Sequence, residues 1–238
     1  MNDDTNAPRD TANWARRADG LKVGELPSEA INLNVDGRQV VGPLQGFGQL
    51  WQKTYHVRLA DCTATPQTVI AAWKANFPDF QPAHNRFYPS IAGVVPGEVV
   101  LINASLQGMP VQTGVMVLYA DELSFTLMTP QGHPESGWVT FSAWEEEGST
   151  VAQVQSMARA NDPLYELGFA LGGAAAQEAI WHHVLISLAS HHGVTGQSVH
   201  VEKQCVDGRL QWGQARNIWQ NAAIRSLLYA LMRPFRRG

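Results

Sequence analysis

The chain has 238 residues, of which 45% are hydrophobic and 16% are charged, and its formal net charge at pH 7 is −4. This length and apolar content predict one large domain, or one domain with appended segments, built on a substantial core. The negative net charge argues against a nucleic-acid-binding protein, because a basic surface is needed to neutralise phosphate groups.

The cysteine content and the polar N-terminus bear on the cellular compartment of the protein. Cys62 and Cys205 are the only cysteines, and two thiols in a chain of this size are typical of a reducing environment. The first twenty residues lack the apolar stretch of a signal peptide, and the sequence has no run of about eighteen apolar residues that would span a membrane. We therefore expect a cytoplasmic protein without a transmembrane segment.

The N-terminal part is predicted to contain an arm and a hairpin. Residues 1–26 are mostly polar, with a lone Trp14, and we expect a mostly disordered arm. Residues 31–41 alternate around the dipeptide Asp36-Gly37, which favours a two-residue turn between paired strands.

A strand and a helix follow. Apolar and polar residues alternate along 50–59, which predicts a half-buried strand. Thr65 is suited to cap a helix that begins at Pro66, and Pro78 is suited to end it. Residues 79–96 form a long connection that the sequence does not resolve.

A five-strand antiparallel meander is predicted next, over residues 98–106, 111–119, 122–128, 138–145 and 150–157. If Glu145 faces Thr150 across the last turn, Val139 and Ala152 share one face of the sheet. Trp138, Thr140, Gln153 and Gln155 then share the other. Neither face is plainly polar, so the sequence leaves open which one would line a cavity.

One long helix is predicted over residues 162–192. Asp162 is suited to cap it, Pro163 fits its first position, and Gly193 is suited to end it. The pair Gly172-Gly173 inside this helix has two interpretations: it makes room for a ligand or a kink, or it allows close packing of the helix on the sheet.

The last segment is predicted to form a second hairpin, over residues 198–206 and 209–212, and a final helix over residues 215–232. Arginines after position 232 make the end of the chain basic. A helix packed on the domain with a solvated tail is the simplest interpretation, with membrane or partner docking as the alternative.

This order of elements resembles the helix-grip fold of the START-like, or SRPBCC, superfamily. The resemblance is carried by the loop GHPESG (132–137), the strand end QVQSMARA (153–160) and the helix start DPLYELGF (162–169). The sequence is most similar to a family within that superfamily whose function is unknown. The resemblance implies an α+β fold, in which a curved antiparallel sheet wraps a long C-terminal helix and an apolar ligand pocket lies between them. It implies no particular reaction and no cofactor.

We accordingly expect three regions. Residues 1–26 form the arm, residues 27–193 form the START-like helix-grip domain, and residues 194–238 form a C-terminal hairpin and helix packed on that domain.

The candidate ligand-binding residues combine aromatic rings with a few polar groups, as small-molecule sites usually do. They are Tyr119, Phe125, His133, Trp138, Thr140, Gln153, Gln155 and Tyr165. His133 also has a side chain suited to general acid–base catalysis, near Glu135 in the same loop. The alternative is that this loop is simply solvated.

Two other polar groups have structural explanations. Glu178, His182, His183, His191 and His192 carry metal-binding side chains. Their positions on a helix do not bring them to one site, and no metal is expected. Arg159 could meet a ligand carboxylate, but an ion pair with Asp162 or Glu166 is the preferred interpretation.

Three functions fit the sequence. The first is binding of a hydrophobic small molecule, aromatic or lipid-like, between sheet and helix. The second is an enzyme similar to polyketide cyclases and dehydratases in the same cavity. The third is an interaction module that forms a homodimer through the C-terminal segment, where Trp212, Trp219 and Tyr229 are of the kind that interfaces favour.

Overall fold

The structure is a computed structural model, and it describes residues 10–25, 29–106 and 108–232. Its strands are β1 (Leu50–Leu59), β2 (Asn85–Pro89), β3 (Val99–Leu106), β4 (Met109–Ala120), β5 (Ser124–Met128), β6 (Glu135–Glu146), β7 (Ser149–Ala160) and β8 (His200–Asp207). Its α-helices are α1 (Pro66–Ala75), α2 (Pro163–Gly168), α3 (Ala174–His191) and α4 (Ala222–Met232).

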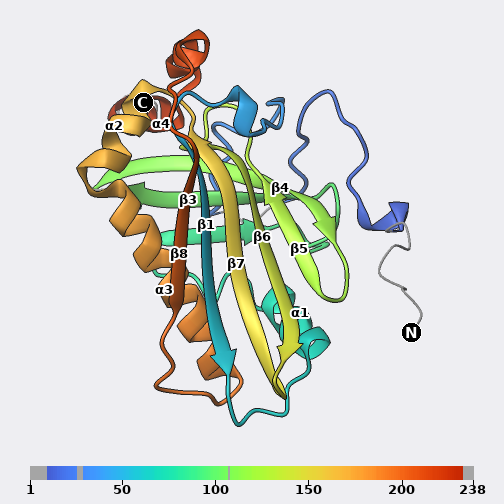
Figure 1. Cartoon of the computed structure of the whole chain (residues 1–238). Coiled ribbons are helices and arrows are strands. Elements are labelled where there is room, and N and C mark those ends of the chain that lie inside the picture. The colour runs from blue at the N-terminus through green and yellow to red at the C-terminus, as the bar shows by residue number, and fades with distance from the viewer. Residues whose placement is uncertain (1–9, 26–28, 107, 233–238) are drawn as a thin grey trace.

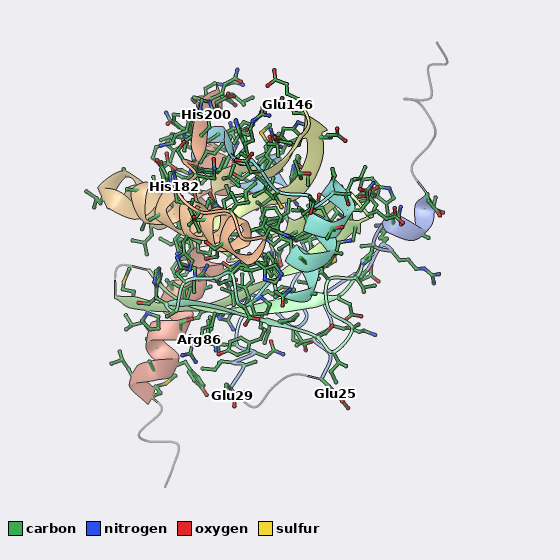
Figure 2. All side chains as sticks on the ribbon, turned by 90° about the horizontal axis from the view of Figure 1, so that it is seen from below. Glu25, Glu29, Arg86, Glu146, His182 and His200 are labelled. Atoms are coloured by element: carbon green, nitrogen blue, oxygen red, sulfur yellow. The ribbon has the colours of Figure 1, made fainter. Side chains whose placement is uncertain are left out.

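The strands form one antiparallel sheet in the order β2-β3-β4-β5-β6-β7-β1-β8, which α3 crosses on one side (Figure 1). Seen from below, the sheet curves around α3 and α1, whereas α4 lies on the outer side of β3 and β4 (Figure 2). The predicted α+β helix-grip fold is therefore confirmed. We call the side of the sheet that faces α3 the inner face.

The core lies between the inner face, α1 and α3. Trp73 of α1 packs against Phe125 and Phe141 of the sheet, with ring centroids 6.2 and 5.2 Å away. From α3, Leu185 and Leu188 are fully buried in the same cluster. At about 25 cal/mol for each Å² of apolar surface removed from water, aromatic and leucine side chains of this size supply most of the stabilisation.

Several local predictions are confirmed. The strand over residues 50–59 has the predicted bounds, and Glu145 pairs with Thr150 across the β6–β7 turn. Pro66 begins α1, and the Thr65 hydroxyl accepts a hydrogen bond of 3.3 Å from the Thr68 N–H. In each case short-range chemistry decides the structure, because alternation fixes strand faces and a side-chain cap satisfies a free N–H.

The long C-terminal helix is interrupted, so the prediction of one continuous helix is corrected. Residues Phe169–Gly173 form a π-helical turn between α2 and α3. Within it, Gly172 has φ 116° and ψ −9°, a conformation that side chains other than hydrogen disfavour. Gly173 allows close packing as well, since a Cβ there would lie 2.8 Å from the Gly168 carbonyl oxygen. The kink interpretation therefore holds at Gly172, whereas the close contact at Gly173 is with its own helical turn and not with the sheet.

The predicted N-terminal hairpin is wrong, although its turn is present. Gly37 has φ 74°, and the Val35 carbonyl accepts from the Arg38 N–H at 3.0 Å. The flanking residues do not pair as strands; Val40 instead bridges to Pro130. The turn dipeptide predicts a local bend, but burial of Val35 against the outer face of the sheet decides where the chain goes.

Residues 10–25 correct the prediction of a mostly disordered arm, and residues 1–9 and 26 of that arm lie outside the described residues. Leu21 is buried with Leu101 and Met116 on the outer face of β3 and β4. Trp14 lies against Tyr119, with ring centroids 4.7 Å apart. Glu25, at the end of this segment, lies on the same outer side (Figure 2).

The C-terminal segment contributes a strand to the main sheet, so the second predicted hairpin is also wrong. β8 pairs along β1, with Trp51 opposite Cys205. Residues 209–212 form no strand and lead into a 3-10 helix, Trp212–Gln220. α4 then packs through Ala222 and Ala223 in a cluster with Val111 of β4. The predicted basic end, residues 233–238, lies outside the described residues.

Candidate functional site

A cavity of about 150 Å³ lies between the inner face of the sheet and α3, and we call it the inner cavity. Its wall is mostly apolar, with Phe87, Ile102, Val115, Leu127, Val139 and Ile180 among its residues. An apolar protein cavity of about 150 Å³ accommodates a molecule the size of benzene. The inner cavity therefore matches one ring rather than an extended chain.

A second cavity, of about 250 Å³, adjoins the first beneath the interruption between α2 and α3, and we call it the outer cavity. The two cavities share four wall residues, Glu135, Ser156, Ala158 and Phe169. The rest of the outer wall is more polar and includes Lys53, Lys203 and Glu166. Together the cavities give a space that is apolar inside and charged at one end.

A chain of three polar side chains stands where the cavities adjoin. The Gln177 amide nitrogen donates to the Glu135 carboxylate at 2.6 Å, and the Lys53 ammonium donates to the Gln177 amide oxygen at 2.8 Å. The same ammonium lies 5.8 Å from the ring centroid of Phe169. Because donor and acceptor alternate along the chain, the orientation of the Gln177 amide is fixed.

His133 lies on a loop between β5 and β6 that is held from several sides. The Gly132 carbonyl accepts from the Ala222 N–H at 2.9 Å, and the Pro134 carbonyl accepts from the Asn161 N–H at 2.9 Å. A Cβ at Gly132 would lie 2.1 Å from the Gln220 carbonyl oxygen, so only glycine fits there. The loop therefore presents His133 to the inner cavity from a fixed position.

Burial sets the protonation state of His133. Desolvation in the apolar wall is the main cause that lowers the pKa of the imidazole from 6.5 to about 4. The ring is therefore neutral at physiological pH. Nδ1 lies 3.0 Å from the Glu135 nitrogen, which leaves Nε2 for other contacts.

Of the predicted ligand-binding residues, His133 and Trp138 line the inner cavity. Trp138 touches only the edge of the cavity, because alternation along β6 directs its side chain to the outer face, opposite to Val139. Phe125 is fully buried, stacked on Phe141 with a centroid distance of 4.6 Å, and does not line the cavity. Its role is packing of the core.

Two predicted tyrosines lie away from both cavities. The Tyr119 hydroxyl donates to the Asp121 carboxylate, and its ring lies against Trp14. Tyr165 is buried beside α4, where its hydroxyl oxygen accepts from the Ala223 N–H at 3.0 Å. Burial raises the pKa of the Tyr165 phenol well above its usual range. Tyr165 thus holds the C-terminal segment in place.

Thr140, Gln153 and Gln155 lie on the outer face of the sheet. Thr140 and Thr126 hydroxyls are 2.9 Å apart, and the Gln155 amide donates to the Thr54 hydroxyl at 3.1 Å. Gln153 donates to Ser142 at 3.5 Å. The face that lines the cavity is the one that carries Val139 and Ser156, so these three polar side chains satisfy one another instead of a cavity ligand.

Several wall residues were not predicted from the sequence. Lys53 and Gln177 belong to segments whose other inward-facing residues are apolar. A polar residue that interrupts such an apolar pattern is the sequence feature by which both could have been identified. Lys53 follows the same strand face as Tyr55 and Val57. Thr113 carries a weaker signal, because a threonine in an apolar strand is common.

The helix residues that carry metal-binding side chains do not meet. Among the described residues, no group of three or more such side chains could hold a metal ion. Glu178 pairs with Lys203, the His182 ring lies against Tyr55, and the His191 ring lies against Phe80. His183 lies exposed on α3.

Arg159 is a structural residue, but its partner differs from the predicted ones. Its guanidinium pairs with the Asp207 carboxylate at 2.7 Å and donates to the carbonyls of Gly48 and Arg209 at 2.7 and 3.0 Å. The predicted partners were acidic residues close in sequence, whereas Asp207 is brought near by the pairing of β8 with β1.

The fold and the cavity together define a helix-grip protein with an apolar internal site. The sequence matches the family described as "Domain of unknown function (DUF1990)" over residues 52–186, more than half of the chain, and the protein belongs to that family. This match confirms the predicted similarity to a family of unknown function. Comparison with curated proteins gave no match. No helix among the described residues is long and apolar enough to cross a membrane.

Three solved structures illustrate what the chain resembles. A START superfamily protein from Mycobacterium smegmatis is 18% identical, with a TM-score of 0.42, and the alignment covers 61% of this chain and 98% of that one. The ginseng major latex-like protein 151 from Panax ginseng is 16% identical, with a TM-score of 0.38, over 61% and 99% of the two chains. The di-domain ARO/CYC StfQ of the steffimycin biosynthetic pathway is 11% identical, with a TM-score of 0.45, over 60% and 50%.

Proposed function

We propose that the protein binds a small hydrophobic molecule, about the size of one ring, in the inner cavity. The observation that carries this proposal is the cavity itself, with a volume of about 150 Å³ and a mostly apolar wall. Burial of a ligand there would be driven by removal of its apolar surface from water, while a few polar groups set its orientation.

The size and the position of the cavity support the proposal further. Dense packing of protein interiors leaves little free space between packed elements, so a mostly apolar pocket of this size between the sheet and α3 is a distinct feature of the molecule. Ile180 of α3 lines the cavity, whereas Ile186 of the same helix does not and is 39% exposed. These two isoleucines provide a matched pair for testing the site.

The first experiment is native mass spectrometry of the purified protein, followed by titration with α-methylstyrene, an apolar single-ring probe, observed by NMR. We expect a co-purifying molecule or binding of the probe, and loss of both in the Ile180→Trp variant, whose indole fills part of the cavity. The Ile186→Trp variant is the control and should bind as the unaltered protein does. An empty protein that does not bind the probe would refute the proposal.

A second candidate function, an enzyme acting on a hydrophobic or polyketide-like substrate, is favoured by the ionisable groups of the wall. The neutral His133 ring and the Glu135 carboxylate both line the inner cavity, and two such groups can donate and accept a proton. The test is exchange of the methyl protons of acetophenone for deuterium in D₂O. Exchange that is faster than in buffer and is abolished in Glu135→Gln would support an enzyme. Exchange at the buffer rate would contradict the enzyme, and ligand binding would remain as the proposed function.

A further inference from the structure

The backbone of Glu135 determines which nitrogen of His133 carries the hydrogen. The Glu135 N–H points at Nδ1 over 3.0 Å. The Glu135 carbonyl oxygen is also 3.0 Å from Nδ1. A carbonyl oxygen can accept from another donor, whereas the hydrogen of a backbone N–H is permanent and stays directed at Nδ1. A hydrogen on Nδ1 would face the N–H hydrogen directly. Nδ1 is therefore the acceptor, and the neutral ring carries its hydrogen on Nε2.

The Nε2–H group has no protein acceptor within residues 10–25, 29–106 and 108–232; the hydrogen bonds of the ring are those at Nδ1. The ring is only half-buried and lines the inner cavity, so this N–H is available to a molecule inside it. Because the loop is fixed through Gly132 and Pro134, the donor is held in place before a ligand arrives.

Two further wall residues carry polar hydrogens without a partner among the described residues. The Thr113 hydroxyl and the Trp181 indole nitrogen are buried and make no hydrogen bond. Both atoms have almost no accessible surface, so they do not reach the cavity space, and the Nε2–H group of His133 is the donor that this part of the wall presents.

Glu135 determines the charge that such a ligand can carry. Its carboxylate lines the same cavity, and it is compensated by the neutral amide of Gln177, with Lys53 in contact only with the far end of that amide. A carboxylate ligand would bring a second negative charge into an apolar space, which is costly. A neutral acceptor oxygen carries no such cost.

We infer that the ligand of the inner cavity is a neutral single-ring molecule whose carbonyl, or a comparable acceptor oxygen, accepts a hydrogen bond from Nε2–H of His133. This inference rests on the proposed function, since it names the chemistry of the molecule that the cavity takes. His133 would then determine the preference of the protein for an oxygen-bearing ligand over a purely apolar ligand of the same shape.

Acetophenone and α-methylstyrene test the inference, because they differ only in a carbonyl oxygen replaced by a methylene group. We expect the protein to bind acetophenone about three- to tenfold more tightly, the range that one neutral hydrogen bond typically supplies. The His133→Asn variant keeps an acceptor for the Glu135 N–H but lacks Nε2, so the preference should disappear. The His183→Asn variant is the control, because His183 is exposed on α3 and lines neither cavity.

The outcomes separate the two proposals. Equal affinity for both probes, or a preference that survives in His133→Asn, would overturn the inference and leave hydrophobic binding intact. Failure of both probes to bind would refute the proposed function and the inference with it. A long-range ¹H–¹⁵N NMR spectrum of the unaltered protein gives a test that needs no variant. We expect Nε2 protonated and Nδ1 unprotonated, and the reverse pattern would overturn the inference.

Discussion

Replacing His133 with asparagine is expected to make the stability of the fold less sensitive to pH. In the unfolded chain an imidazole takes up a proton near pH 6.5, whereas in the folded protein burial lowers the pKa of His133 to about 4. Between these values the unfolded state binds more protons, so the free energy of unfolding falls as the pH is lowered from about 6.5 towards 4. The stabilisation is fully present above about pH 6.5 and is lost below about pH 4.

The size of the effect follows from the same values. Each tenfold difference in proton affinity is worth about 1.4 kcal/mol, so the difference between 6.5 and about 4 gives a ceiling of about 3 kcal/mol. His133 is only half-buried, and solvent screening reduces this to about 2 kcal/mol near pH 4.5. That loss is a large fraction of the typical stability of a domain, about 5–15 kcal/mol.

Urea denaturation at about pH 7.5 and about pH 4.5 measures the effect. The unaltered protein should lose about 2 kcal/mol more between the two pH values than the His133→Asn variant does. A His183→Asn variant, altered at an exposed position of α3, is the control and should behave as the unaltered protein. Equal losses in the unaltered protein and the His133→Asn variant would show that His133 is not held neutral by its surroundings, and the reasoning would fail.

Three further predictions concern stability and assembly. Gly132→Ala should lower the free energy of unfolding, measured by urea denaturation, by about 3 kcal/mol or more, because it adds a steric clash to an unfavourable φ. The control Gly148→Ala adds only the φ penalty of about 1 kcal/mol, and similar losses in the two variants would contradict the clash. Asp162→Ala removes a buried cap that accepts from two N–H groups of α2, and it should lower the free energy of unfolding by about 2–3 kcal/mol. Thr65→Ala, at the exposed cap of α1, should lower it by about 1 kcal/mol, and equal losses would argue against a buried network at Asp162. Trp219, which is 85% exposed, is the residue to replace by glutamate in a test of the predicted homodimer. We expect a concentration-dependent mass in light scattering that becomes monomeric in Trp219→Glu, and a monomer at all concentrations would contradict the dimer.

Short-range patterns were sufficient to predict most strands of the sheet, with the exception of β2, and long-range pairing was not predictable from them. Alternation along residues 50–59 and the cap at Thr65 depend on neighbours in sequence. β8 forms because its backbone groups pair with β1, about 150 residues away, and the turn signal at Asp207-Gly208 predicts a hairpin that this pairing overrides.

The same distinction applies to the site. His133 was predictable as a polar residue in a shaped loop. Its low pKa was not, since desolvation depends on the apolar wall that α3 and the sheet build around it. Gln153 and Gln155 were assigned to the site because the two faces of β7 are similarly mixed in polarity. A two-residue periodicity separates the faces of a strand but does not say which face a distant helix will cover.

The contacts of Gly132 with Gln220 and Ala222 make the position of His133 in the cavity wall depend on a part of the chain that the family match does not include. The match ends at residue 186, yet the loop that carries His133 rests on Gln220 and Ala222. In relatives that lack this C-terminal segment, position 132 would be free to accept other residues and the histidine would lose its fixed orientation. The identity of position 132 and the presence of the segment should therefore be inherited together, and an alignment of relatives can be sorted by that pair.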